Sequence, residues 1–390
     1  MDWSFLTRNK EALYVTTDSR KVTPGSVFVA LKGEHFDGND YVEQAKADGA
    51  AYIISGENAL AELQDLARAW RRELGLPIIG ITGTNGKTTT KELCAAVLKT
   101  KYNLYYTQGN LNNQLGVPLT LLSITRAHEM AIVEMGASHP GDIKELVEIA
   151  EPNYGLITNV GRAHLQGFGS FEGVQRTKAE LYDFLCAHGG TIFRNADNPY
   201  LKEMLGRIEC RNNLKGIVEY QTGTMPEGTH LVGGYNAENV SAAICVGTYF
   251  GVSAETALEA IRAYVPSNNR SQLMQTEKNT VVVDAYNANP TSMQAAINAF
   301  KGDTYILGAM RELGEYSHLE HQNIVNMLLE RKAEKVLLVG EEYKETTAPY
   351  PVYDDVEALC AALRQTPLNG CTILLKGSRS NQLEKVIPLL

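Results

Sequence analysis

Long hydrophobic runs are absent from this sequence of 390 residues. No apolar run approaches the roughly 20 residues that a membrane-spanning helix needs. The N-terminus, MDWSFLTRNK, lacks the basic and then apolar pattern of a signal peptide. We therefore expect a cytoplasmic protein with no membrane span.

Cysteine pairs and basic clusters are also missing. The six cysteines are scattered and include no C-x-x-C pair, so we expect reduced thiols and no zinc site. The formal net charge is −9, and no basic run is interleaved with aromatic residues. This composition argues against nucleic acid as a partner and favours small-molecule substrates. We expect the chain to act as a monomer.

The segment PIIGITGTNGKTTTKE, residues 77–92, predicts a buried strand, a glycine loop and the start of a helix. Gly83 and Gly86 allow backbone angles closed to other residues, so that consecutive N–H groups can turn toward a phosphate at the helix N-terminus. Lys87 supplies a positive charge for the β- and γ-phosphates, and Thr88 a hydroxyl for magnesium. The pattern predicts nucleotide binding, and an ordinary glycine-rich turn is the alternative.

The spacing of this loop departs from the standard phosphate-binding pattern, whose first glycine would fall on Ile81. With its own spacing, TGTNGKTT resembles the nucleotide loop of the Mur ligase family. These are ATP-dependent, amide-forming enzymes of peptidoglycan precursor synthesis, and so of cell-wall biogenesis, cell shape and cell division. The resemblance implies that ATP is bound by Gly83, Thr84, Asn85, Gly86, Lys87, Thr88 and Thr89.

Residues 1–76 predict a small α/β domain, with strands at 27–33 and 50–55 and helices at 40–49 and 58–74. The stretch that begins DSRKVTPGSVFVALKG at Asp18 resembles the UDP-sugar-binding N-terminal domain of Mur ligases that act late in the pathway. That resemblance implies that Ser19 and Arg20 contact the uridine diphosphate. The alternative is a solvated turn, capped by Asp18, with Arg20 at the surface.

Residues 77–265 alternate between strand and helix patterns, which predicts a mainly parallel sheet with helices on both faces. Ligands of such sheets bind beyond the carboxyl ends of the strands. The expected strands are 77–82, 103–106, 130–135, 154–159 and 190–194, and the expected helices are 87–100, 117–125, 141–150 and 171–187.

An amide-rich loop, TQGNLNNQLGVPLTLL, occupies residues 107–122. Asparagine both donates and accepts hydrogen bonds, so this loop suits a peptide-like ligand, although turn chemistry also favours asparagine and glycine. By resemblance, Thr107, Asn110 and Asn113 line the site of the acceptor carboxylate and the γ-phosphate.

One ionisable residue predicts a magnesium site by its position, and two more are implied by the resemblance. Glu134 ends the apolar strand of AIVEMGAS, and a carboxylate there needs a cation; a structural salt bridge is the alternative. His164 and Lys178 follow the next strand, and alone they would be an ordinary histidine and a solvated helical lysine. By resemblance, His164 binds a second magnesium ion, and Lys178 is carbamylated, which makes it an acidic metal ligand.

The segment GGYNAENVSAAICVGTYFGV, residues 233–252, resembles the family pattern G-x-H-N-x-x-N-x-x-A-A. Tyr235 stands where histidine is usual, which leaves the contribution of that histidine open. By resemblance Asn236 approaches the adenine, and Asn239 is structural.

The third domain is predicted to span residues 266–390, because VPSNNRSQ breaks a helical run at residues 265–272. By resemblance, Arg270 reaches the ATP phosphates. A strand then ends in Asp284, an arrangement that binds ribose in nucleotide folds and does so in this family. The amides of the following turn, Asn287 and Asn289, are expected to contact a dipeptide substrate.

The string D-x-Y-N-A-N-P-x-S-M is characteristic of the family member that adds D-alanyl-D-alanine. The resemblance therefore implies three α/β domains: 1–76 for the UDP-sugar, 77–265 for ATP, and 266–390, a Rossmann-like ligase domain. It implies a ligase that joins D-alanyl-D-alanine to UDP-MurNAc-tripeptide through an acyl phosphate and a tetrahedral intermediate. Lys87, Arg270 and two magnesium ions would neutralise charge, and Lys87, Glu134, His164, Lys178 and Arg270 would form the catalytic set.

Two other classes remain open. A P-loop kinase or simple nucleotidase would use residues 77–160 equally well, but it has no need of DAYNANPTSM. A regulatory relative that only binds UDP-sugars is the other possibility, although Lys87, Glu134, His164 and Lys178 are all present. Within the family, a folylpolyglutamate synthase is disfavoured because those enzymes lack the N-terminal domain.

Overall fold

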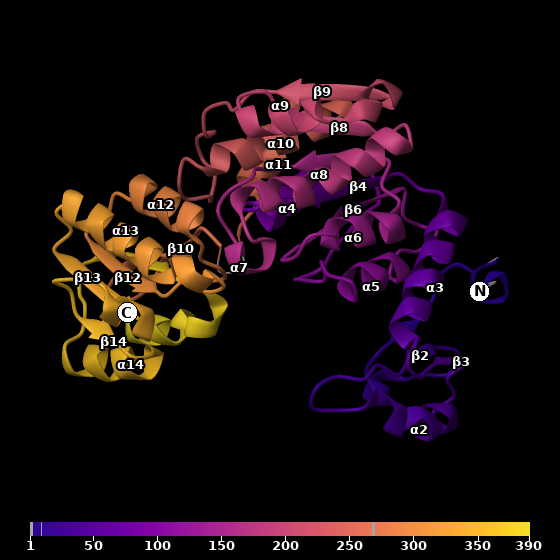
Figure 1. The fold of residues 1–390 in the computed structure, drawn as a ribbon, viewed down its shortest axis with the longest axis horizontal. Coiled ribbons are helices and arrows are strands. Elements are labelled where there is room, and N and C mark those ends of the chain that lie inside the picture. The colour runs from indigo at the N-terminus through magenta and orange to yellow at the C-terminus, as the bar shows by residue number, and fades with distance from the viewer. Residues whose placement is uncertain (1–2, 9, 267–269) are drawn as a thin grey trace. The chain divides into compact units, whose positions relative to one another are not determined.

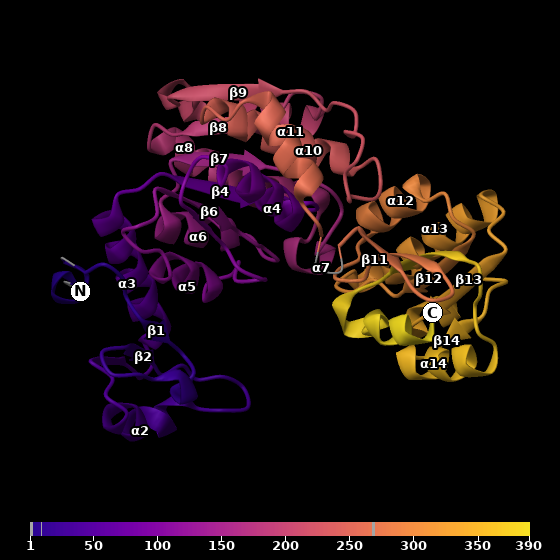
Figure 2. The same cartoon turned by 180° about the vertical axis from the view of Figure 1, so that it is seen from behind.

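The computed structural model describes residues 3–8, 10–266 and 270–390 (Figures 1 and 2). The described chain forms two compact units. The first comprises Met1–Gly83, Leu98–Ile157 and Arg176–Tyr220, and the second comprises Thr84–Val97, Thr158–Gln175 and Gln221–Leu390. The predicted α/β class is confirmed, because the chain forms three sheets of mostly parallel strands with helices between them in the sequence. The predicted division at residues 76 and 266 stays a prediction, and residues 267–269 of the expected boundary lie outside the described ranges.

The first unit begins with a small parallel sheet of β1 (Val15–Thr16), β2 (Val27–Val29) and β3 (Tyr52–Ile54), accompanied by α1 (Ser4–Thr7) and α2 (Val42–Ala47). All three residues of β2 are buried. The strand predicted at 27–33 ends early because the chain turns back, and Gly38 N donates to Leu31 O at 2.9 Å.

Helix α3 (Ala59–Leu74) ends at Gly75, whose φ of 63° permits the left-handed turn. Its buried side chains bind other elements of the first unit: Trp70 Nε1 donates to Ile124 O at 2.8 Å, and Arg71 Nε donates to Ala150 O at 3.0 Å. These bonds tie α3 to the helices beside the second sheet.

The second sheet of the first unit confirms the predicted parallel arrangement. Its order is β5 (Leu104–Tyr106), β6 (Met130–Glu134), β4 (Ile78–Thr82), β7 (Tyr154–Ile157), β8 (Thr191–Asn195) and β9 (Gly216–Tyr220). The associated helices are α5 (Gly116–Leu122), α6 (Asp142–Ala150), α8 (Phe171–Ala187) and α9 (Pro199–Gly206). Helix α8 packs closely on β7, because a Cβ on Gly155 would lie 2.4 Å from Leu185 Cδ1.

In the second unit, helices α4 (Lys87–Leu98), α7 (Leu165–Phe168), α10 (Asn236–Tyr249) and α11 (Ala254–Ala263) precede the last sheet. A Cβ on Gly247 would lie 2.3 Å from Val97 Cγ1, so α4 and α10 approach closely there. The sequence prediction contained no separate helix at α11, which Ser253 caps by accepting from Thr256 N.

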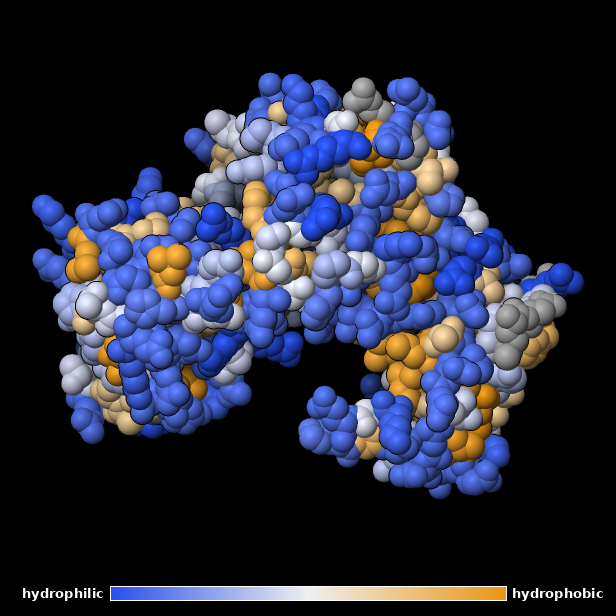
Figure 3. Space-filling view, viewed as in Figure 1, coloured by the Kyte–Doolittle hydropathy of each residue, from blue (hydrophilic) through white to orange (hydrophobic). Residues whose placement is uncertain are grey.

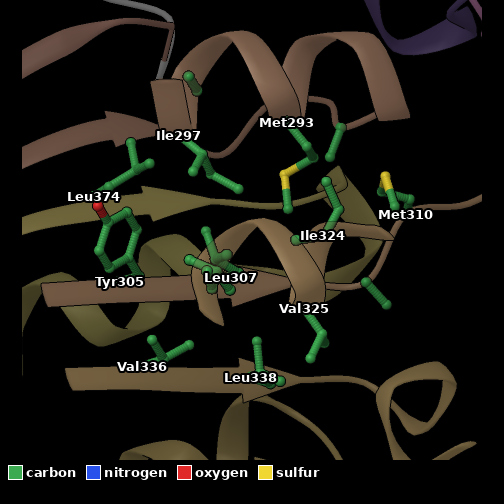
Figure 4. Close-up of a cluster of buried hydrophobic side chains, with 14 of the residues drawn as sticks. Met293, Ile297, Tyr305, Leu307, Met310, Ile324, Val325, Val336, Leu338 and Leu374 are labelled. Atoms are coloured by element: carbon green, nitrogen blue, oxygen red, sulfur yellow. The ribbon is translucent and has the colours of Figure 1, made fainter. Parts of the chain in front are cut away.

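The last sheet has the order β10 (Gln272–Gln275), β11 (Thr280–Asp284), β15 (Thr372–Lys376), β12 (Thr304–Gly308), β13 (Lys335–Val339) and β14 (Val352–Tyr353), and only β10 is antiparallel. Helices α12 (Pro290–Ala299) and α13 (Ser317–Glu330) cover one face, where Met293, Ile297 and Leu307 interlock with their neighbours (Figure 4). Helix α14 (Val356–Gln365) covers the other face. The short 3₁₀ turns are η1 (Ser19–Lys21), η2 (Gly38–Tyr41), η3 (Glu209–Asn213), η4 (Gly314–Tyr316), η5 (Glu341–Glu345), η6 (Arg379–Asn381) and η7 (Leu383–Leu389).

The face drawn in Figure 3 is mostly hydrophilic, with scattered apolar patches. Among the described residues, no helix has the length and apolar character required to span a membrane.

Candidate active site

The glycine loop lies where the sequence predicts it, between the buried strand β4 and the first turn of α4. Gly86 has a φ of 78°, and a Cβ there would lie 2.4 Å from Asn239 Oδ1. Glycine is therefore required both by the backbone angle and by the close approach of a second side chain. Lys87 Nζ donates to Thr84 O at 3.1 Å, Thr88 is buried, and Thr89 is half-buried.

The segment after β7 holds this loop in shape. Asn85 N donates to Asn159 Oδ1 at 3.0 Å, and Thr158 Oγ1 donates to Asn85 O at 2.6 Å. Thr84 N donates to Asn159 O at 2.9 Å, and Gly161 N donates to Thr84 Oγ1 at 2.9 Å. Backbone groups fixed in this way can receive a phosphate at the N-terminus of α4 without first ordering the loop.

A chain of amides at the start of α10 reaches the same loop. Asn236 Nδ2 donates to Val232 O at 2.8 Å, and Asn239 Nδ2 donates to Asn236 Oδ1 at 2.9 Å. Asn239 Oδ1 in turn accepts from Thr90 Oγ1 at 3.0 Å. Asn236, which is predicted to bind the adenine, is therefore connected through Asn239 to the first turn of α4, directly after the glycine loop.

Tyr235, at the position of the usual histidine, has a definite role here. Its hydroxyl lies 2.7 Å from Ser271 Oγ, one residue beyond Arg270. Burial raises the pKa of the tyrosine, with the nearby Asp284 adding to the rise, so the phenol stays neutral. The side chain packs on the core shown in Figure 4 and links α10 to the start of β10.

In the turn between β11 and α12, the two amides predicted to contact the substrate, Asn287 and Asn289, make local hydrogen bonds. Asn289 caps α12 by accepting from Ser292 N at 2.9 Å, and its Nδ2 donates to Asn85 Oδ1 at 2.8 Å. Asn287 Oδ1 accepts from Ala288 N at 3.0 Å. The amides therefore shape the turn, and Asn289 also contacts the glycine loop.

Asp284 directly precedes this turn, and Arg270 contacts a tyrosine within it. The guanidinium of Arg270 lies 3.9 Å from the ring centroid of Tyr286, which is a cation–π contact. The guanidinium of Arg379 lies 5.6 Å from the same centroid. Asp284 ends β11 and accepts from Lys376 Nζ at 2.6 Å. The residue predicted to bind ribose therefore ends β11, and the residue predicted to bind phosphate contacts the turn after that strand.

His164 adopts a left-handed backbone angle, with φ of 49°, and its Nδ1 pairs with the carboxylate of Glu312. Glu312 also has a positive φ, of 61°. A histidine that donates one ring N–H to a carboxylate is the usual arrangement of a metal-ligating imidazole.

In the first unit, Glu134 ends β6 with 1% of its surface exposed. Its Oε1 accepts from Asn112 Nδ2 at 2.8 Å, and its backbone N donates to Thr107 Oγ1 at 2.9 Å. Asn112 was not predicted, although it lies in the amide-rich loop. The predicted Asn113 instead starts α5 by accepting from Gly116 N at 2.8 Å, and Asn110 O accepts from Asn112 N.

Lys178 lies in α8 with only 2% of its surface exposed, which excludes a solvated helical lysine. Two residues further on, Glu180 accepts from Gly141 N at 2.9 Å and Lys144 N at 2.8 Å, and so fixes the start of α6. Burial raises the pKa of the Glu180 carboxyl. Glu180 is therefore a structural carboxylate.

Ser19 and Arg20 form the turn η1 (Ser19–Lys21), which Asp18 caps by accepting from Arg20 N at 3.1 Å. The Arg20 side chain is 87% exposed and binds Asp18 through two bonds of 2.9 Å. This pair lowers the pKa of Asp18 to about 2. The capped turn foreseen as the alternative is present, and it presents the guanidinium to solvent.

Two of the predicted ligands, one in each unit, are of the kind that magnesium takes. Mg²⁺ prefers oxygen ligands, and proteins usually supply one or two carboxylates while substrate phosphates and water complete the shell. The buried Glu134 carboxylate and the Thr88 hydroxyl are donors of this kind. Within the described ranges, no group of three or more His, Cys, Asp or Glu side chains is placed so that it could hold a metal ion.

A phosphate loop at the start of a helix, on a parallel sheet with polar strand ends, defines an α/β nucleotide-binding protein. The chain matches the models of the Mur ligase middle domain over residues 81–223, the Mur ligase glutamate ligase domain over 269–379, and the Mur ligase family catalytic domain over 13–96. The chain belongs to the Mur ligase family, whose members are ATP-dependent ligases.

Curated and solved relatives cover nearly the whole chain. The UDP-N-acetylmuramoyl-tripeptide–D-alanyl-D-alanine ligase of Bacillus subtilis is 33% identical, covering 96% of this chain and 92% of its own length. The enzyme of that name from Escherichia coli is 31% identical, covering 96% and 93%. The structure of MurF from Thermotoga maritima in complex with ADP has a TM-score of 0.84, at 27% identity and 98% coverage of both chains.

Proposed function

We propose that this chain is an ATP-dependent ligase that joins D-alanyl-D-alanine to UDP-MurNAc-tripeptide, forming UDP-MurNAc-pentapeptide, ADP and phosphate. The observation that carries the proposal is the 33% identity to the Bacillus subtilis ligase across 96% of the chain. The preformed glycine loop supports the use of ATP. Because ATP and UDP-linked sugars are cytoplasmic compounds, we place the reaction in the cytoplasm. We propose that the chain acts as a monomer.

The chemistry follows from the weakness of a carboxylate as an acyl donor, since hydroxide is a very poor leaving group. One oxygen of the tripeptide carboxylate attacks the γ-phosphorus of ATP, ADP leaves, and an acyl phosphate forms. The amine of the dipeptide attacks the acyl carbon and gives a tetrahedral intermediate. That intermediate expels phosphate, and the nitrogen loses a proton to leave the amide.

The side chains position these groups and neutralise charge, and none forms a covalent bond with the substrate. Lys87 and Arg270 contact the phosphates, Asn236 the adenine, and Asp284 the ribose. Ser19 and Arg20 hold the uridine diphosphate. The tripeptide carboxylate is received by Thr107, Asn110 and Asn113, with Asn112 orienting Glu134 at 2.8 Å.

Two Mg²⁺ ions held by Thr88, Glu134, His164 and a carbamylated Lys178 would supply electrostatic stabilisation to the triphosphate. Two observations support these magnesium ligands. Glu134 and Lys178 are buried, and His164 pairs with the carboxylate of Glu312. Carbamylation replaces the positive charge of Lys178 with a negative one, which removes the conflict between a buried ammonium and a cation site.

A cavity of about 370 Å³ beside the ends of β12 and β13 is a candidate site for the dipeptide. Charges of both signs line it, as a zwitterion requires: Arg311 for the carboxylate and Asp355 for the ammonium. Lys385 and Glu357 also line it and pair with each other, Nζ to Oε1, at 2.6 Å. Asn287 and Asn289 would then act indirectly, by shaping the turn that follows β11.

The test is a ligation assay on the full chain with ATP, Mg²⁺, D-alanyl-D-alanine and UDP-MurNAc-tripeptides that carry either lysine or diaminopimelate at the third position. We expect mass spectrometry to detect pentapeptide, with formation dependent on all three substrates. Phosphate release without the dipeptide, or a stable phosphorylated product, would instead indicate a nucleotidase or a kinase.

A further inference from the structure

A lysine that the sequence did not single out lies at the end of the central strand of the last sheet. Lys376 ends β15, which lies between β11 and β12. In the parallel register of β11 and β15, Asp284 and Lys376 are direct partners at the last position of each strand. Their side chains therefore leave the sheet on the same side.

The contact between the two residues is short and shielded from water. Lys376 Nζ donates to Asp284 Oδ2 at 2.6 Å, and the two side chains are 2% and 15% exposed. The same ammonium also donates to Asn287 O at 3.4 Å. Lys376 therefore binds both the strand-end carboxylate and the turn that leads into α12.

Stability alone does not account for this lysine. Burying an ammonium is costly, and replacing a buried ion pair with apolar residues is often neutral or stabilising. What the pair does provide is a fixed carboxylate: one oxygen of Asp284 is held by the ammonium. In the part of the chain that the structure describes, no hydrogen bond is made by the other oxygen, Oδ1.

We propose that Lys376 is a positioning residue that aims Asp284 Oδ1 at a ribose hydroxyl of the nucleotide. This inference rests on the proposed role of Asp284 in ribose binding. The positive charge has a second effect: it cancels the charge of Asp284, which would otherwise repel the polyphosphate of the same nucleotide. The lysine thus allows a carboxylate to serve as the hydroxyl acceptor beside a polyanion.

The test compares the affinity of the full chain for ADP, 2′-deoxy-ADP and 3′-deoxy-ADP by calorimetry. In the unchanged protein, removal of the bound hydroxyl should weaken binding roughly tenfold or more, since a hydrogen bond to a charged group is lost. In Lys376→Met this penalty should fall to about twofold, because the carboxylate is no longer aimed. A residue that only stabilised the fold would weaken all three nucleotides equally.

The matched control is Lys344→Met, which removes an exposed lysine paired with Asp354 at 2.7 Å, beside the edge strand β14 of the same sheet. This variant should keep the full loss of affinity for the deoxy nucleotide.

If Lys376→Met also keeps the full loss of affinity, the positioning role is wrong, while ribose binding by Asp284 stands. If the unchanged protein shows no penalty, the ribose role of Asp284 and with it this inference fail, whereas the ligase activity is decided by the pentapeptide assay. Should Lys376→Met not fold, Lys376→Gln is measured in the same way, with partial loss expected and full retention contradicting the proposal.

Discussion

Lys178 illustrates at the scale of one residue how burial changes an interpretation. A solvated helical lysine could be replaced by alanine at a cost of at most about 0.5 kcal/mol. Lys178 is only 2% exposed, so its replacement removes a group from the protein interior. We predict that Lys178→Ala abolishes ligation while circular dichroism shows a folded protein, because a carbamate ligand is lost.

Two measurements separate this explanation from simple loss of packing. Formate or acetate should restore part of the rate of Lys178→Ala by occupying the vacated space, whereas chloride should not. Carbon-13 NMR with labelled bicarbonate should report the carbamate in the unchanged protein. Replacement of the exposed Lys202 by alanine is the control and should leave ligation unaltered. A fully active Lys178→Ala variant would remove this lysine from the site.

The Asp18–Arg20 pair gives a second residue-level prediction. The hydrogen bond from Arg20 lowers the pKa of Asp18 from 3.8 to about 2. Because the pKa is lower in the folded state, the stabilising contribution of the pair is present above pH 3.8 and is lost as pH falls through about 2. NMR titration of the Asp18 carboxyl carbon should show this value, and Arg20→Gln should return it toward 3.8. Titration near 3.8 in the unchanged protein would contradict the observed pairing.

The site residues that sequence reasoning found are those with local signals. Gly86 and Lys87 belong to one loop, and Glu134 ends an apolar strand. The missed residues act through distant partners: Asn112 binds a side chain 22 positions away, and Lys376 binds one 92 positions away. Local sequence patterns do not predict such contacts, because the partners are far apart in the sequence and only the fold brings them together.

At the scale of an element, the glycine loop before α4 can be tested with a matched pair of glycines. Gly86 and Gly56 both have positive φ, of 78° and 88°, but only Gly86 has an atom within 4 Å of an added Cβ. Gly56→Ala should cost about 1–2 kcal/mol through backbone strain alone. Gly86→Ala should cost more and should weaken ATP binding, because Asn239 must move. Equal effects in thermal unfolding and in calorimetry would show that the Asn239 contact is unimportant.

Helix α13 contains a histidine whose neutral form the fold requires. His321 is fully buried, accepts from Met310 N through Nε2 at 3.0 Å, and donates from Nδ1 to Ser317 O at 2.7 Å. Burial lowers the pKa of His321 below its usual 6.5. The unfolded chain therefore takes up a proton first, and stability is lost as pH falls below 6.5 toward the folded-state pKa.

The prediction is a drop in melting temperature between pH 7.5 and pH 5.5 that is smaller in His321→Gln, since glutamine does not titrate. His139→Gln changes an exposed histidine and should leave the drop unaltered. An unchanged drop in His321→Gln would mean that this histidine does not carry the pH dependence.

For the whole molecule, the alternation of strand and helix patterns was sufficient to predict the α/β class and the parallel sheets. The predicted strand at 130–135 corresponds to β6, and the helix at 171–187 to α8. The elements without a prediction, such as β14 with its two residues, are short, and their pairing depends on tertiary contacts. Tyr235 likewise acquired a role only when the fold placed it against Ser271.

The central claim is that ATP activates the carboxylate of the tripeptide, and the most direct measurement follows that carboxylate's oxygen atoms. UDP-MurNAc-tripeptide labelled with oxygen-18 in its terminal carboxylate is converted with ATP and D-alanyl-D-alanine, and the released phosphate is analysed by mass spectrometry. The proposed acyl phosphate predicts one labelled oxygen in each phosphate, in an amount equal to the pentapeptide formed. Unlabelled phosphate, with or without pentapeptide, would contradict the proposed reaction.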